Sequence, residues 1–139
     1  MLPLRQNTIK SKKRVRDFGE VFTPSWLVSD MCDLAEPDIS DPAKTVLEPA
    51  CGNGNFLVEV LRRKLKNCKN DEQMIMAVGN LFGVDILPDN IHECHGRLLN
   101  FLPLHLWGEA KTIFERNIIQ GDFLKPETIW FLNDNGQCD

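Results

Sequence analysis

The sequence predicts an α/β fold with a parallel sheet of at least three strands and helices packed against it. The first observation is a short apolar strand that runs into a glycine-rich turn and then directly into an amphipathic helix, at residues 46–60. The second is a pair of further apolar strand patterns, at residues 81–86 and 117–124, each preceded by helical periodicity. Strands that alternate with helices are typical of parallel strands joined by helical crossovers.

A first helix is expected at residues 25–34, before the first strand. Leu27, Met31 and Leu34 follow an i, i+4, i+7 pattern, which predicts that this stripe faces the core. Thr23 is expected to cap the helix, with Pro24 at the first helical position, where its missing N–H has no cost. Capping alone would be enough to account for Thr23.

After the glycine turn, a helix at residues 55–65 is expected to bury Phe56 and Val60. The later elements are expected in the order short helix 72–78, strand 81–86, helix 88–101, helix 105–117, strand 117–124, helical turn 125–132 and a fourth strand starting at Gln137. The Asn-Asp-Asn-Gly turn signal at residues 133–136 predicts that last strand.

The charge of the chain is unevenly distributed. The net charge is -4, yet a group of basic residues precedes the first acidic residue, Asp17: Arg5, Lys10, Lys12, Lys13, Arg14 and Arg16. We therefore divide the chain into a basic, flexible arm at residues 1–17 and a body at residues 18–139. Such an arm could follow nucleic-acid phosphates; a solvated, poorly ordered terminus is the alternative.

Several classes of protein are disfavoured by the composition. The five cysteines form no Cys-x-x-Cys pair, which argues against a disulfide framework or a zinc knuckle. A metal site is also disfavoured on the helix with His92, Cys94 and His95, because Cys94 points away from the two histidines. No apolar run approaches the roughly 18 residues of a membrane span, and no secretory signal opens the chain. We expect a cytoplasmic protein.

The glycine turn predicts a ligand site. Gly52 and Gly54 lack Cβ atoms, so a ligand can approach bare backbone, and the free amides at the start of the helix can donate to an anionic group. Glu48 adds an acceptor at the end of the strand. A tight loop that only needs unusual backbone geometry is the alternative interpretation.

Acidic residues also end the second and third strands. Asp85 stands where the acid of a βαβ nucleotide site accepts from ribose hydroxyls. Asp122 could accept the exocyclic amine of a purine while Phe123 covers the ring. Taken singly, Asp85 could be a helix-entry carboxylate and Phe123 a core residue.

These motifs together resemble a known family. Phe22-Thr23-Pro24, the glycine turn at residues 47–56, Gly83-Val-Asp-Ile86 and Gly121-Asp-Phe123 resemble, in that order, DNA adenine methyltransferases of restriction-modification systems. These belong to the class I S-adenosylmethionine-dependent methyltransferases, which have a Rossmann-like three-layer αβα fold. A dehydrogenase is less favoured, because Leu57 stands where Gly-x-Gly-x-x-Gly requires glycine.

The resemblance implies a binding site for S-adenosyl-L-methionine. Thr23 and the turn would hold the methionine part, Glu48 its ammonium, Asp85 the ribose and Asp122 the adenine amine, with Phe123 and Ile86 on the two faces of the ring. The full set of implied cofactor-binding residues is Phe22, Thr23, Glu48, Ala50, Cys51, Gly52, Gly54, Asp85, Ile86, Asp122 and Phe123.

One departure from the family matters for activity. The catalytic Asn/Asp-Pro-Pro-Tyr/Phe motif is missing, since no two prolines of the sequence are adjacent. The resemblance therefore implies a truncated methyltransferase fold, cut just before its fourth strand, with no catalytic residue and no methyl transfer alone. DNA is the expected partner of the intact parent, and a homodimer or partner chain is expected on the open sheet edge. The alternatives are a methyltransferase for RNA or protein and a non-catalytic remnant that binds cofactor or protein.

Overall fold

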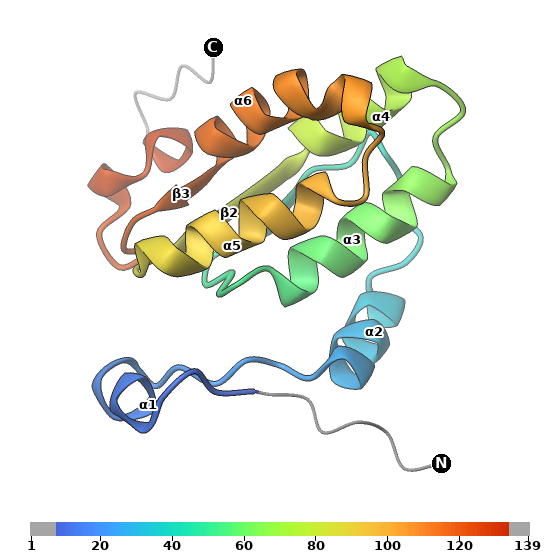
Figure 1. Cartoon of the computed structure of the whole chain (residues 1–139). Coiled ribbons are helices and arrows are strands. Elements are labelled where there is room, and N and C mark those ends of the chain that lie inside the picture. The colour runs from blue at the N-terminus through green and yellow to red at the C-terminus, as the bar shows by residue number, and fades with distance from the viewer. Residues whose placement is uncertain (1–7, 134–139) are drawn as a thin grey trace.

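Within residues 8–133, three short strands form one parallel sheet in the order β1-β2-β3: β1 (Val46–Glu48), β2 (Leu81–Asp85) and β3 (Ile118–Gln120). The computed structural model describes residues 8–133, and Figure 1 shows the strands behind the helices. Glu48 pairs in register with Gly83, and Asp85 with Gln120. The carboxyl ends of the strands therefore lie at one edge of the sheet, and the predicted α/β class is confirmed.

The helices of the body occupy the predicted stretches of the chain. They are α2 (Ser25–Leu34), α3 (Asn55–Lys66), α4 (Asp71–Gly79), α5 (Pro88–Leu99) and α6 (Trp107–Asn117), with 3-10 turns η1 (Leu104–Leu106), η2 (Pro126–Thr128) and η3 (Trp130–Leu132). In Figure 1, α3, α5 and α6 cross the same face of the sheet.

One continuous apolar core joins that helical layer to the sheet. Leu57 of α3, Val78 of α4 and Phe114 of α6 are fully buried against Leu81 and Ile118 of the strands. Burial of a side chain of this size stabilises the fold by about 1.5–3 kcal/mol. The core holds the strand ends, and with them the acidic residues, in fixed positions.

The 3-10 turns near the carboxyl end of the described chain pack against Phe82, on the opposite face of the sheet. The ring of Phe82 lies 5.0 Å from that of Phe131 and 6.5 Å from that of Trp130, and Ile129 is fully buried. The helical turn predicted at residues 125–132 thus packs on the second sheet face. The fourth strand predicted from Gln137 lies outside the described residues.

The face that α2 buries differs from the prediction. Val28 and Cys32 are buried, whereas Met31 and Leu34 of the predicted stripe are exposed. Helix α2 packs against α3, and the residues that face this contact are the ones that are buried. The predicted cap also shifts by one residue: Pro24 is the N-cap, and no side chain caps the helix.

Helix α1 (Lys12–Phe18) lies in the stretch expected to be a flexible arm. Ser11 caps it by accepting from the backbone N–H of Arg14 at 3.1 Å, and Gly19 ends it with a φ of 63°. The helix buries none of its residues, so no apolar period in the sequence predicts it. Ion pairs to α5, described below, hold it in place.

Within residues 8–133, no helix is both long and apolar enough to cross a membrane.

An ion-pair network fastens α2 to α3. Glu59 accepts from Arg62 Nη2 at 2.6 Å and from Arg63 Nε at 2.9 Å, and Arg63 also donates to Ser29 O of α2 at 3.0 Å. The hydrogen bond from Arg62, helped by that from Arg63, lowers the pKa of Glu59 to about 2. Because α2 begins two residues after Thr23, this network helps to position the predicted cofactor contact.

Replacing Glu59 by glutamine should therefore lower stability in a pH-dependent manner. The folded-state pKa is depressed, so the contribution is fully present above the ordinary pKa of 4.5 and is lost as the pH falls towards about 2. We expect a loss of roughly 1 kcal/mol near neutral pH, small because Arg62 is partly solvated. Urea unfolding across this pH range measures it.

The matched control is Glu115→Gln, on the exposed face of α6, whose lysine partner is 4.0 Å away. This variant should match the wild type at every pH. A Glu59→Gln deficit that stays constant down to the acid limit would show that the charge of Glu59 is not the cause.

Candidate functional site at the strand ends

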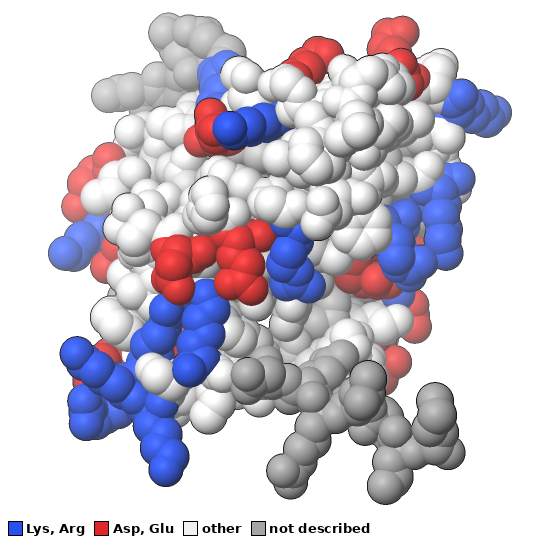
Figure 2. Space-filling view, viewed as in Figure 1, with Lys and Arg blue, Asp and Glu red and all other residues white. Residues whose placement is uncertain are grey.

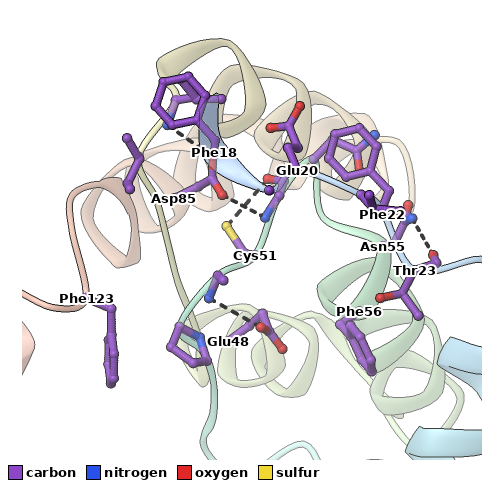
Figure 3. Close-up of a pocket in the computed structure, with 18 of the residues that line it drawn as sticks. Phe18, Glu20, Phe22, Thr23, Glu48, Cys51, Asn55, Phe56, Asp85 and Phe123 are labelled. Atoms are coloured by element: carbon purple, nitrogen blue, oxygen red, sulfur yellow. Dashed lines mark hydrogen bonds between the residues drawn. The ribbon is translucent and has the colours of Figure 1, made fainter. Parts of the chain in front are cut away.

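A pocket of about 540 Å3 lies at the carboxyl ends of the strands. All of the predicted site residues except Gly54 line it. In Figure 3, Phe123 lies at one side of the pocket and Thr23 at the other, with Asp85, Cys51 and Glu48 between them. The structure thus brings residues from distant parts of the sequence to one cavity.

The glycine turn forms the floor of this pocket. Gly52 has a φ of 54° and Gly54 a φ of 99°, both in the left-handed region that favours glycine. A Cβ on Gly52 would lie 3.1 Å from the ring of Phe22. Gly54 faces away from the pocket, against α5, where a Cβ would lie 2.6 Å from Cys94 Sγ. Gly52 therefore leaves room for Phe22, and Gly54 leaves room for Cys94.

Asp85 is tied to the turn and to the start of α5. Its Oδ1 accepts from the backbone N–H of Gly52 at 3.2 Å, and its Oδ2 accepts from that of Leu87 at 3.1 Å and from Asn90 Nδ2 at 2.9 Å. A carboxylate has about four acceptor positions, so these bonds fix its orientation and leave it capacity for a ligand. Asp85 therefore holds the turn in place and also lines the pocket.

Glu48 sits half-buried beside the turn. Burial raises the pKa of its carboxyl group, although the backbone N–H of Ala50, which donates to Oε1 at 3.3 Å, opposes that shift. A carboxylate that is partly removed from water gains more from a cationic partner than an exposed one does. This corner of the pocket suits an ammonium group.

Asp122 and two apolar side chains form the opposite end. Asp122 Oδ1 accepts from the backbone N–H of Leu124 at 2.9 Å, which fixes the loop after β3. Phe123 is 42% exposed and Ile86 is 48% exposed, although both are large apolar residues. Apolar surface left open at the mouth of a pocket is a typical contact for a flat ring.

The N-terminal wall of the pocket contains residues that the sequence did not single out. Phe18, Glu20 and Val21 line it, close to the predicted Phe22 and Thr23. The backbone carbonyl of Thr23 accepts from Asn55 Nδ2 at 2.8 Å, so the wall is joined to the turn. Asn55 could have been identified from its place in the Gly-Asn-Gly-Asn turn. No sequence pattern indicated Glu20 or Phe18.

Across residues 8–133, no group of three or more His, Cys, Asp or Glu side chains is placed to hold a metal ion.

A pocket at the carboxyl ends of parallel strands, beside a glycine turn and a strand-end acid, is the arrangement of α/β proteins that bind nucleotides or nucleoside cofactors. The fold and the position of the pocket in this chain have this arrangement.

Comparison with known proteins gives the family. The N-6 DNA Methylase family matches residues 4–95, and the chain belongs to this family, as the resemblance predicted. The Type II methyltransferase M.VspI of Vibrio sp. (strain 343) is 30% identical over 106 residues, which are 76% of this chain and 21% of that protein. The Type II restriction enzyme and methyltransferase RM.BcgI of Heyndrickxia coagulans is 38% identical over 69 residues, or 49% of this chain and 10% of that protein.

The chain therefore spans about a fifth and a tenth of the lengths of these two relatives. No solved structure shows a significant match.

Proposed function

We propose that this chain binds S-adenosyl-L-methionine and forms the cofactor-binding part of a DNA adenine methyltransferase of a restriction-modification system. The observation that carries the proposal is the convergence of Glu48, Asp85 and Asp122 on the one pocket at the glycine turn. Membership of the N-6 DNA Methylase family supports adenine in DNA as the substrate. The two relatives are named as methyltransferases, one of them also as a restriction enzyme.

In this proposal the nucleoside part of the cofactor lies between β2 and β3. Asp85 accepts from the ribose hydroxyls with the acceptor capacity that its protein contacts leave. Asp122 accepts a hydrogen bond from the adenine amine, and Phe123 and Ile86 cover the two faces of the ring. Their exposed apolar surface in a pocket of about 540 Å3 fits such a ring.

The methionine part lies over the turn. Glu48, whose partial burial favours a cationic partner, receives the ammonium, while the backbone of Ala50, Cys51 and Gly52 and the side chain of Thr23 surround the rest. Phe22 packs on Gly52 and closes the floor. At Gly52 the missing Cβ leaves room for the ring of Phe22, and the ligand meets the backbone of the turn beside that ring.

The bound cofactor would supply an electrophilic methyl group for direct displacement by the adenine amine. The residues of this chain would align it and keep it in place. The sequence contains no Asn/Asp-Pro-Pro-Tyr/Phe motif to hold a flipped adenine. The activity proposed for residues 1–139 alone is thus binding without transfer.

Calorimetric titration with S-adenosylhomocysteine tests the proposal. We expect saturable heat with one ligand per chain, and the same chain should give none with NAD. Absence of heat would favour the alternative of a remnant that binds a protein.

A methyltransferase for RNA or protein is the other alternative. Methylation assays on DNA, RNA and protein, with a chain that also contains the Pro-Pro-aromatic motif, separate these substrates.

We also propose that a second copy or a partner chain covers the outer edge of β1. In the described sheet β1 pairs with β2 alone, so its other edge offers backbone N–H and C=O groups to another strand. Light scattering of the chain at increasing concentration should show a dimer or larger species. A single monomeric species throughout the range would contradict self-association.

A further inference from the structure

Helix α5 carries polar side chains that fasten the N-terminal segment, which we define as residues 8–23. Asp89 pairs with Lys10 at 2.9 Å and with Arg14 at 2.7 Å, and Glu93 pairs with Lys10 at 3.0 Å. Figure 2 shows acidic side chains on the lower side of α5 that meet the basic side chains of α1. The hydrogen bond from Arg14, followed by that from Lys10, lowers the pKa of Asp89 well below its usual range. These ion pairs link the N-terminal segment to α5.

Asn90 lies beneath these ion pairs and is fully buried. Its Oδ1 accepts from Lys10 Nζ at 2.6 Å. Its Nδ2 donates to Glu20 Oε2 at 2.7 Å and to Asp85 Oδ2 at 2.9 Å. A single amide group thus joins a cation and a carboxylate of the N-terminal segment to the carboxylate of the pocket.

The side chain at position 90 must be a neutral group with two donor hydrogens and one acceptor. Aspartate would place a third carboxylate beside Glu20 and Asp85, and leucine would remove a hydrogen bond from each of them. Arg14 contributes a further link, because its Nε lies 2.7 Å from Glu20 Oε1. A displacement of the segment would thereby reach Asp85 through Glu20 and Asn90.

We infer that Asn90 is a positioning residue that couples docking of the N-terminal segment to the orientation of Asp85, so that the segment and a nucleoside ligand bind cooperatively. The inference rests on the proposed function, in which Asp85 accepts from the ribose. Coupling between two binding events is reciprocal. A ligand in the pocket should therefore hold the segment down, and loosening the segment should weaken the ligand.

The first test uses Arg14→Gln, which loosens the segment from outside the pocket. We expect the dissociation constant of S-adenosylhomocysteine to rise about fivefold to twentyfold, within the usual range of coupling. Amide hydrogen exchange of residues 12–22 should be faster than in the wild type without ligand, and ligand should slow it in the wild type. The matched control is Arg16→Gln on the same helix, whose ion pair is with its neighbour Asp17. It should leave both measurements unchanged.

The second test separates positioning from a general effect on stability. Wild-type chain should prefer S-adenosylhomocysteine over its 2′-deoxyribose analogue by about tenfold or more, because a hydrogen bond to a charged acceptor is lost. In Asn90→Leu this preference should fall to about threefold or less. A role limited to folding would leave the preference of the folded molecules intact.

Two outcomes are distinguishable. If the wild type binds S-adenosylhomocysteine, but Arg14→Gln and Asn90→Leu keep its affinity and ribose preference, the coupling is disproved and the proposed function stands. If the wild type itself does not bind, the proposed function fails and the coupling with it. Arg14→Gln keeps the inference open to disproof even if Asn90→Leu does not fold.

Discussion

Replacing Asp85 by alanine should abolish measurable binding of S-adenosylhomocysteine. The variant loses the proposed acceptor of both ribose hydroxyls, and each charged hydrogen bond is worth about 1.5–3 kcal/mol. Two such bonds correspond to a weakening of roughly 100-fold to 10,000-fold. The backbone N–H of Gly52 also loses its partner, which adds to the effect. Isothermal titration calorimetry on folded variants measures it.

Two variants control for indirect effects of that change. Asp85→Asn keeps the size of the side chain and removes its charge, so its affinity should lie between those of the wild type and Asp85→Ala. Glu109→Ala removes an exposed carboxylate on α6, outside the pocket, and should bind as the wild type does. If Asp85→Ala binds S-adenosylhomocysteine with an affinity within about threefold of the wild type, Asp85 does not contact the ligand.

The second large effect is expected from Gly54→Ala, on stability. Alanine at a φ of 99° is strained by about 1–3 kcal/mol. Its Cβ would also lie 2.6 Å from Cys94 Sγ and 3.3 Å from Cys94 Cβ, so Cys94 must shift, at a further cost of about 1–3 kcal/mol. Together these are a large share of the 5–15 kcal/mol typical of a folded domain. The midpoint of urea unfolding should fall accordingly.

Gly96→Ala is the matched control for this substitution. Gly96 lies on α5 close to Cys94, and a Cβ there meets no atom within 4 Å. That variant should gain about 0.5–1 kcal/mol from helix propensity. Adding Cys94→Ala to Gly54→Ala should recover the part of the loss that comes from crowding. If Gly54→Ala unfolds at the wild-type midpoint, the tight contact with α5 does not constrain the turn.

The elements that the sequence predicted well are those specified by local pattern. The apolar strands and the turn with Gly52 and Gly54 predicted a parallel sheet with its acids at one edge, and Glu48, Asp85 and Asp122 do line one pocket. Parallel strands bring their carboxyl ends together, so identifying the strands was sufficient to collect these residues. Their roles toward a cofactor stay predictions.

The features that the sequence did not predict arise from tertiary contacts. Helix α1 buries no side chain and is held by ion pairs between Arg14 and residues six and 75 positions away. Asn90 shows no motif, and its importance follows from three partners that only the fold assembles. The inward face of α2 depended on its contact with α3, so Leu27, Met31 and Leu34 gave a plausible but incorrect stripe.

The strand that leads into the glycine turn lies at one edge of the described sheet. β1 has three residues and a hydrogen-bonded neighbour on one side in the described chain. The turn that follows is tied to β2, because the backbone N–H of Cys51 donates to Val84 O at 2.8 Å and that of Gly52 donates to Asp85 Oδ1 at 3.2 Å. A polypeptide that pairs with the outer edge of β1 would add hydrogen bonds to the strand before the turn, and we expect it to tighten ligand binding without touching the ligand.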